Sequence, residues 1–195
     1  MNKRVLIVRH AERPAIPRGQ TGIDLQLTKY GINSTKQFAK TLKGNIISIH
    51  SSPVLRCLQT ARLIAEITTF DQSKIKQNRL LGNPGIFIKD EKLAWKSWKD
   101  KGNNAVNLHL LTGIETWPGF RPFDKAINKI HDQIRVALSN CNSGTIIWIT
   151  HDTILAPLAS RLLENPLLMD DWPNYLGYLD CSINKNEQMT YNYSK

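Results

Sequence analysis

Six side chains in this sequence are of the types needed to bind a phosphate group and transfer it. They are Arg9, His10, Arg13, Arg56, His151 and Asp152. An arginine guanidinium matches the oxygens of a phosphate geometrically and stays charged at every relevant pH. A neutral imidazole can attack phosphorus and hold the phosphoryl group covalently, which splits hydrolysis into two easier steps. The pattern therefore predicts capture of an anionic group by arginines and its transfer to a histidine.

His10 is the better candidate for the nucleophile, because Arg9 and Arg13 stand close to it in the sequence. Adjacent cations lower the pKa of a histidine and so favour its neutral form. Arginines near a helix N-terminus would also stabilise the charge on the transferring group. A leaving alkoxide needs a proton, which Asp152 could supply if burial or a second carboxylate raised its pKa. Asp152 equally suits the structural role of a helix N-cap, and the two roles are compatible.

The elements that must position these residues follow from hydrophobic periodicity and from turn residues. Continuous apolar runs predict buried strands at 5–8, 46–49 and 145–149, a further strand at 75–81, and edge strands at 176–183 and 189–193. Amphipathic runs predict helices from the cap Thr28 to 43, from Pro53 with Ser52 as its cap to 67, from 123 to 141, and after Asp152.

Alternation of apolar strands with helices predicts an α/β fold with a mainly parallel sheet and helices on both faces. In such sheets the ligand crevice lies at the carboxyl ends of the strands. The six candidate side chains follow three predicted strands. We therefore expect them to meet at one edge of one sheet.

The length of 195 residues fits a single domain over 1–195. Within it, the segment 83–121 is rich in Gly, Trp and Lys and is expected to be an insertion packed over the sheet. The formal net charge of +10 indicates an anionic partner. Because the lysines are spread rather than clustered, a phosphorylated small molecule or phosphopeptide is favoured and nucleic acid is not.

The three cysteines Cys57, Cys141 and Cys181 show neither paired nor metal-type spacing and are expected to be buried fillers in a reducing compartment. Because the first strand is predicted to begin by about residue 4, we expect no secretory leader, and no apolar run approaches the ~20 residues of a membrane helix. We expect a cytoplasmic protein that contacts no membrane and has no metal site. The sequence carries no indication of the oligomeric state.

Three segments resemble the motifs of the histidine phosphatase superfamily, in the family's order and over roughly residues 4–165. The run 9–14 resembles its Arg-His-Gly signature, 51–61 its second motif and 149–153 its third. The resemblance implies a three-layer, phosphoglycerate-mutase-like fold and a phosphohistidine on His10. It also implies phosphate binding by Arg9, Arg13 and Arg56, a pocket completed by His151, and no metal or organic cofactor.

Two branches of the superfamily remain open for this chain. Arg13-Pro14 and His151-Asp152 are similar to the acid-phosphatase branch, where the aspartate donates the proton. The small size and the Ser-Pro-x-x-Arg-x-x-Gln-Thr-Ala form are similar to the mutase branch, where a glutamate of the central insertion donates it. Asp152 is the first choice for the acid, and Asp90 or Glu91 is the alternative.

One position departs from the family pattern, because Ala11 stands where glycine is usual. If the backbone there needs a positive φ, alanine costs on the order of 1 kcal/mol. No chemical group is lost by this change. The expected activity is that of a phosphomonoester hydrolase, with mutase-type phosphoryl transfer or an inactive phospho-ligand binding module as alternatives.

Overall fold

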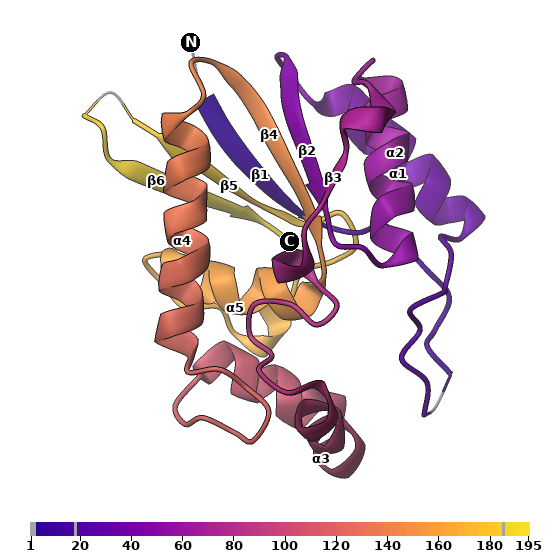
Figure 1. Ribbon diagram of the computed structural model, residues 1–195, viewed down its shortest axis with the longest axis vertical. Coiled ribbons are helices and arrows are strands. Elements are labelled where there is room, and N and C mark those ends of the chain that lie inside the picture. The colour runs from indigo at the N-terminus through magenta and orange to yellow at the C-terminus, as the bar shows by residue number, and fades with distance from the viewer. Residues whose placement is uncertain (1–2, 18, 185) are drawn as a thin grey trace.

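The computed structural model describes residues 3–17, 19–184 and 186–195, and it contains one mixed sheet flanked by helices (Figure 1). The six strands found among these residues lie in the order β3-β2-β4-β1-β5-β6. Their bounds are Lys3–Arg9 (β1), Ile46–Ser51 (β2), Lys76–Gln77 (β3), Gly144–Thr150 (β4), Tyr178–Ile183 (β5) and Met189–Ser194 (β6). Strands β1 to β4 are parallel, and β5 and β6 add an antiparallel edge. The predicted α/β class is confirmed.

Helices cover both faces of the sheet. Their bounds are Lys29–Thr41 (α1), Leu55–Ile67 (α2), Glu91–Thr112 (α3), Phe123–Ser139 (α4) and Asp152–Leu162 (α5), with short 3-10 turns at Gln72–Lys74, Arg79–Leu81 and Met169–Asp171. Helices α1 and α2 lie on one face, α4 and α5 on the other, and α3 lies below the sheet in Figure 1.

Strand β1 explains why both faces need helices. Val5 and Ile7 belong to the core cluster shared with α4 and α5, whereas Leu6 and Val8 belong to the cluster shared with α1 and α2. All four side chains are buried. Because successive side chains of a strand point to opposite faces, an unbroken apolar run is stable only between two layers of helices.

The carboxyl ends of β1, β2 and β4 meet because β4 lies between the other two. The backbone N–H of His10 donates to the carbonyl of Thr150, and that of Ser52 donates to the carbonyl of Ile149, both at 2.9 Å. The chain leaves β1 and β2 toward one face and leaves β4 toward the other. A crevice opens where the connections diverge in this way.

The predicted start of α2 is wrong by two residues. The helix begins at Leu55 rather than Pro53, and its N-cap Val54 forms no side-chain cap. Ser52, the expected cap, instead places its Oγ 2.9 Å from Nε2 of His151. A side chain committed to a distant histidine is a weak cap, and this moves the first helical turn along the chain.

One further prediction is corrected in the middle of the chain. Only Lys76–Gln77 pairs with β2 in the segment expected to be a strand at 75–81, and Arg79–Leu81 is a 3-10 turn. Within 83–121, α3 consists of two helical stretches that meet at a kink at Gly102, where φ is 80° and ψ is 169°. No helix of the described residues, α3 included, is long and apolar enough to cross a membrane.

The start of α1 is fitted against the loop that carries His10. Thr28 caps the helix as predicted, because its Oγ1 accepts the N–H of Gly31 at 2.9 Å. The same hydroxyl donates to Oε1 of Glu12 at 2.7 Å, and the Thr28 N–H donates to the Glu12 carbonyl at 3.0 Å. A Cβ on Gly31 would lie 2.2 Å from that carbonyl oxygen, so helix and loop can approach this closely only at a glycine.

We predict that Gly31→Ala destabilises the protein by about 1–3 kcal/mol, although alanine is the better helix former, because the added methyl displaces the Glu12 backbone. Urea unfolding measures the change. Asn33→Ala, at an exposed position of the same helix, is the matched control and should stay within about 0.5 kcal/mol of wild type. Equal stability of the two variants would contradict the close fit.

Candidate active site

One arginine joins the two histidines at the strand ends. Arg56, in the first turn of α2, donates from Nε to Nε2 of His10 at 2.9 Å. Its Nη2 lies 3.1 Å from Nδ1 of His151, and its Nη1 donates to the carbonyl of Gly22 at 2.7 Å. Arg56 is only 8% exposed and both histidines are buried. Segments after β1, β2 and β4 and the loop 14–28 therefore meet at a single guanidinium.

These contacts fix the tautomers of both rings, because a guanidinium only donates hydrogen bonds. Nε2 of His10 must carry a lone pair, and its Nδ1–H then donates to the Ala11 carbonyl at 2.7 Å. In His151, Nδ1 must accept, and Nε2–H points to Oγ of Ser52 at 2.9 Å. The two imidazoles are opposite tautomers, with ring centroids 5.3 Å apart.

Burial and neighbouring charges keep both rings neutral. Burial, then the neighbouring His151 and then the Arg56 charge hold the pKa of His10 well below its ordinary value. Burial, followed by the Arg56 charge, lowers the pKa of His151 to about 3, and the carboxylate of Asp152 opposes this only in part. At neutral pH the site therefore offers an unprotonated, lone-pair-bearing Nε2 on His10.

Arg9 and Asp152 form an ion pair beside the histidines, with Nη2 of Arg9 2.8 Å from Oδ2 of Asp152. The indole N–H of Trp172 also donates to Oδ2 at 3.3 Å, and the N–H of Thr153 donates to Oδ1 at 2.9 Å. Burial alone would raise the pKa of Asp152, but the Arg9 charge and these donors together keep it below its ordinary value. His151, not Asp152, is the N-cap residue of α5.

Two further guanidinium donors are buried at the site without a partner among the described residues. They are the Nε groups of Arg9 and Arg13. Arg13 lies close enough for its charge to lower the pKa of both Arg56 and His151. A buried donor without an acceptor costs free energy, so these two N–H groups remain available to an acceptor that the described residues do not supply. Three guanidinium charges against one carboxylate leave the site with a positive balance.

Ala11 is accommodated without backbone strain. It is fully buried, and it is not among the residues with positive φ. Its N–H donates to Oγ1 of Thr60 at 3.1 Å, and that hydroxyl donates to the Arg56 carbonyl at 2.8 Å. The strain considered for alanine in place of glycine is therefore absent, because the loop does not need a left-handed residue here.

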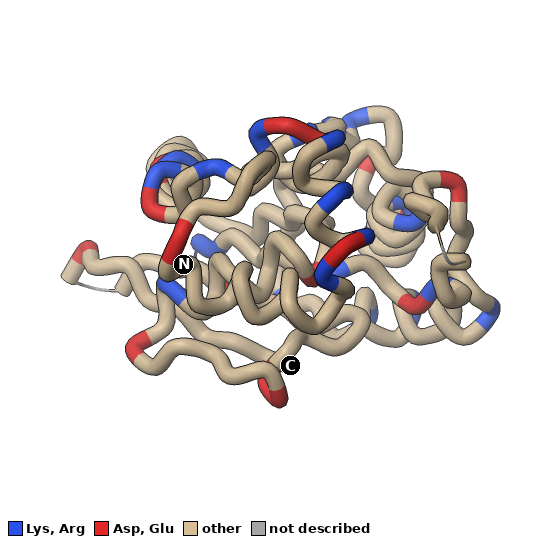
Figure 2. The backbone as a smooth tube through the Cα atoms, turned by 90° about the horizontal axis from the view of Figure 1, so that it is seen from below, with Lys and Arg blue, Asp and Glu red and all other residues tan. Residues whose placement is uncertain are grey.

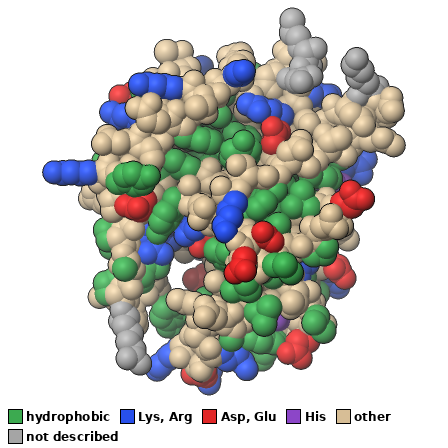
Figure 3. All heavy atoms as spheres, turned by 180° about the vertical axis from the view of Figure 1, so that it is seen from behind, with side chains coloured by type: hydrophobic (Ala, Val, Ile, Leu, Met, Phe, Trp, Pro, Cys, Tyr) green, Lys and Arg blue, Asp and Glu red, His purple; other side chains and the backbone are tan. Residues whose placement is uncertain are grey.

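The rim of the site comes from the loop 14–28 and from the turn around Gly82. The Gly22 carbonyl reaches Arg56, and the space-filling view from behind shows an open hollow between this loop and the rest of the molecule (Figure 3). A Cβ on Gly82 would lie 2.4 Å from the His151 ring and 2.5 Å from Oγ of Ser52. No side chain can therefore project from position 82 while His151 keeps this position.

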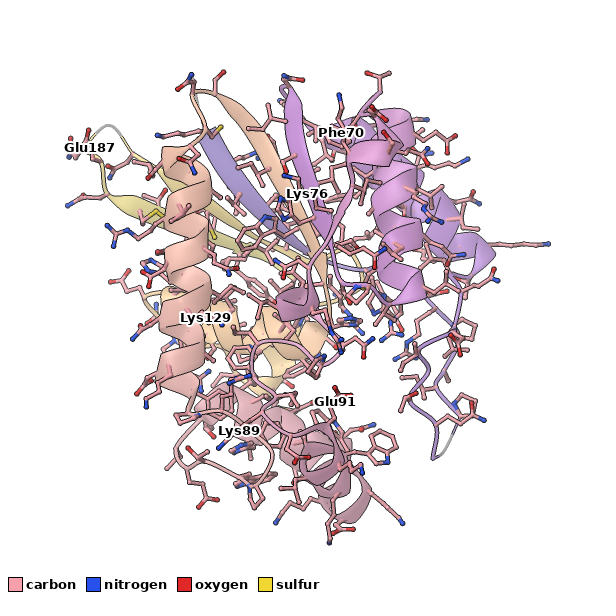
Figure 4. The ribbon with its side chains drawn as sticks, viewed as in Figure 1. Phe70, Lys76, Lys89, Glu91, Lys129 and Glu187 are labelled. Atoms are coloured by element: carbon pink, nitrogen blue, oxygen red, sulfur yellow. The ribbon has the colours of Figure 1, made fainter. Side chains whose placement is uncertain are left out.

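The alternative acids Asp90 and Glu91 are engaged elsewhere. The carboxylate of Asp90 caps α3 by accepting the N–H of Leu93 at 3.0 Å. Glu91 lies 3.9 Å from Arg79 in an exposed ion pair, and Figure 4 shows it at the start of α3, below the sheet. Of the three carboxylates considered from the sequence, Asp152 is the one bonded to another predicted site residue.

Three residues of the site were missed by the sequence analysis: Ser52, Trp172 and Tyr175. Tyr175 stacks on the Arg9 guanidinium, 4.2 Å from Cζ to the ring centroid, and its ring lies 5.8 Å from that of His10. A signal for the aromatic pair did exist. Because β5 runs antiparallel to β1, residues just before β5 must lie beside the end of β1.

The cysteines behave as predicted and are free and buried. Cys57 lies 3.5 Å from Nε2 of His151, but burial raises the pKa of its thiol to about 12, so it remains a neutral filler. Within the described part of the chain, no three His, Cys, Asp or Glu side chains lie close enough together to hold a metal ion.

The family model of the histidine phosphatase superfamily, branch 1, matches residues 5–187. The chain belongs to this superfamily. The matching model is that of branch 1, and the protein is a histidine phosphatase, the enzyme class expected from the sequence. No curated protein matches the chain in a sequence search.

Solved structures of similar fold cover nearly the whole chain. A mycobacterial glucosyl-3-phosphoglycerate phosphatase has a TM-score of 0.64 at 15% identity over 99% of this chain and 97% of its own. A phosphoserine phosphatase mutant from Entamoeba histolytica, in complex with phosphoserine, has a TM-score of 0.65 at 17% identity over 99% and 97%. At such identities the likeness concerns the fold.

We predict that His10 and His151 stay neutral and in opposite tautomers at pH 6. Nitrogen–proton correlation spectra of the imidazoles should show Nδ1–H for His10 and Nε2–H for His151, assigned with His10→Gln and His151→Asn.

The lowered pKa of His151 also predicts that the free energy of unfolding falls as pH drops from 6.5 toward 3, because the unfolded chain binds a proton that buried His151 does not. An imidazolium signal from either ring at pH 6 would contradict the geometry.

Proposed function

We propose that the protein hydrolyses phosphomonoesters through a phosphohistidine on His10. The observation that carries the proposal is the lone pair of Nε2 on His10, held toward Arg56 in a site that also contains Arg9 and Arg13. A nucleophile surrounded by cationic donors is what transfer of a dianionic phosphoryl group requires. His151 would be the second imidazole in contact with that group.

The reaction is proposed to run in two steps. Nε2 of His10 forms a bond to phosphorus while the ester P–O bond breaks, and the leaving oxygen takes its electron pair and a proton from Asp152. A water molecule then attacks the phosphohistidine and gives a proton to the Asp152 carboxylate. The P–N bond breaks, and inorganic phosphate and neutral His10 are released.

Arg56 would link substrate binding to activation of the nucleophile. Its Nε–H donates to the lone pair that His10 would need for attack. Phosphate oxygens are stronger acceptors for a guanidinium than a neutral imidazole is, because they are charged. An arriving phosphate should therefore draw Arg56 away from His10 and expose the reactive lone pair.

Asp152 must acquire a proton before it can act as an acid. Its pKa is lowered by the ion pair with Arg9. A bound phosphate dianion adds negative charge beside the carboxylate and shares the Arg9 cation, and both effects raise a carboxyl pKa. We infer that substrate binding itself brings Asp152 toward its protonated form.

A phosphorylated small molecule is the substrate class that we propose. The related folds include phosphatases for glucosyl-3-phosphoglycerate and phosphoserine, which supports a small phosphorylated metabolite. Lysine and arginine are distributed over many parts of the chain in Figure 2, which favours a compact anion over a nucleic acid. A cytoplasmic location is part of the proposal and is supported by the three buried free cysteines.

We predict that His10→Ala lowers phosphate release from p-nitrophenyl phosphate by at least about a thousandfold, as removal of a covalent nucleophile does. Brief reaction with a ³²P-labelled ester should label wild type in an acid-labile form and leave His10→Ala unlabelled. His131→Ala, whose histidine contacts Tyr191 outside the site, is the control and should keep wild-type activity. Undiminished turnover by His10→Ala would refute the mechanism.

We predict that Asp152→Asn slows hydrolysis of glycerol phosphate by about a hundredfold or more but that of p-nitrophenyl phosphate far less. Only the alkoxide of glycerol needs a proton to leave, and general acid catalysis contributes factors of about 10²–10⁴. Steady-state rates with both esters test this. If the variant slows both esters equally, Glu91→Gln and Asp90→Asn become the variants to compare.

A further inference from the structure

The segment 172–177, just before β5, encloses the Arg9–Asp152 pair. The Pro173 carbonyl accepts from Nη1 of Arg9 at 2.6 Å, and the Gly177 carbonyl accepts the Arg9 backbone N–H at 2.9 Å. Within this segment Trp172 is the residue that contacts the acid, through its indole N–H. Its ring also packs against the larger core cluster, which fixes the direction of that N–H.

We propose that Trp172 is a positioning residue that directs the catalytic proton of Asp152 to Oδ1. The proposal rests on the proposed function, in which Asp152 is the general acid. Under this proposal, Trp172, which lies outside the three motifs, determines which carboxylate oxygen of Asp152 carries the proton.

The hydrogen-bond count of the carboxylate supports this role. Each carboxylate oxygen accepts at about two lone-pair sites. Oδ2 already accepts from Nη2 of Arg9 at 2.8 Å and from Nε1 of Trp172 at 3.3 Å. Among the described residues, Oδ1 accepts from one donor, the N–H of Thr153 at 2.9 Å. The free lone pair is therefore on Oδ1, and a proton added to Asp152 finds its place there.

Arg9 alone would not preserve this arrangement during turnover. Its buried Nε is free to bind a phosphate oxygen, so the Arg9 guanidinium is shared between the substrate and Asp152. The Trp172 indole is uncharged, and its partly buried ring packs against the larger core cluster, so it does not follow the phosphate. It remains as the donor that keeps Oδ2 occupied and the carboxylate plane fixed.

The charged and titratable groups that act on Asp152 come from three elements. They are Arg9 at the end of β1, Arg56 and Cys57 on α2, and His151 at the start of α5. A test at Trp172 changes none of these groups. Any change in the proton affinity of Asp152 then reports the indole contact itself.

The experiment compares Trp172→Phe with wild type on glycerol phosphate and p-nitrophenyl phosphate over a range of pH. Phenylalanine keeps an aromatic ring in the core and removes the donor. We expect kcat for glycerol phosphate to fall about tenfold, as loss of a hydrogen bond to a charged group implies, with KM and the p-nitrophenyl phosphate rate within about twofold of wild type. The indole donor stabilises the carboxylate, so its loss should also move the alkaline limb of the kcat profile for glycerol phosphate to higher pH.

Trp117→Phe is the matched control, because the Trp117 indole also donates to a carboxylate, Oε1 of Glu115 at 2.7 Å. None of the recorded contacts of Trp117 is with a residue of the candidate site. It should leave both esters and the pH profile unchanged. If circular dichroism shows that Trp172→Phe is unfolded, the same measurements are made on a protein with benzothienylalanine at position 172. This analogue of tryptophan differs only in having sulfur in place of the indole N–H.

Each outcome decides the proposal. A loss of kcat with glycerol phosphate alone, together with a shift of the alkaline limb of its pH profile, supports the proposal. Unchanged kinetics, or an equal loss on both esters with an unmoved limb, overturns it and leaves Trp172 as a packing residue. Failure of the proposed function is seen separately, as phosphate release by His10→Ala equal to that of wild type.

Discussion

The Arg56 guanidinium donates to a ring nitrogen of each histidine and to the Gly22 carbonyl, and the site depends on this arrangement. A donor-only group between two imidazoles requires both to be unprotonated on the facing nitrogen. Arg56 therefore selects the tautomers of both imidazoles, opposes their protonation and orients the lone pair on Nε2 of His10. The loop 14–28, the end of β1 and the start of α5 are held in register by the same side chain.

The sheet makes this contact possible by placing β4 between β1 and β2. Backbone hydrogen bonds tie His10 to Thr150 and Ser52 to Ile149, so the positions of three segments of the candidate site follow from strand pairing rather than from flexible loops. The strands can lie at the centre of the sheet because their residues are apolar on both faces. The free energy of two hydrophobic clusters thus offsets the cost of burying Arg56 and partly burying the Arg9–Asp152 ion pair at one edge.

The sequence was sufficient for the parts of the molecule that obey local rules. Apolar runs located β1, β2 and β4, Thr28 was recognised as a cap, and the strand-end rule brought Arg9, His10, Arg56, His151 and Asp152 to one place. The failures share a cause, namely tertiary contacts that override a local preference. Ser52 has the sequence context of a helix cap, yet it bonds to His151, 99 positions away. Trp172 and Tyr175 have no spacing that links them to a motif. The antiparallel pairing of β5 with β1 brings Tyr175 to Arg9 and Trp172 to Asp152.

The state of the acid follows from how Arg9 divides its donors. Nη1 binds the Pro173 carbonyl and Nη2 binds Asp152, while the buried Nε has no partner among the described residues. Because Nε is free, a phosphate oxygen can join Arg9 without first breaking the ion pair, so substrate and carboxylate come to share one cation. Two anions around a single guanidinium repel each other, and protonation of Asp152 relieves that repulsion. In the proposed mechanism, the ion pair that keeps Asp152 charged is then also the contact through which a bound phosphate would make Asp152 an acid.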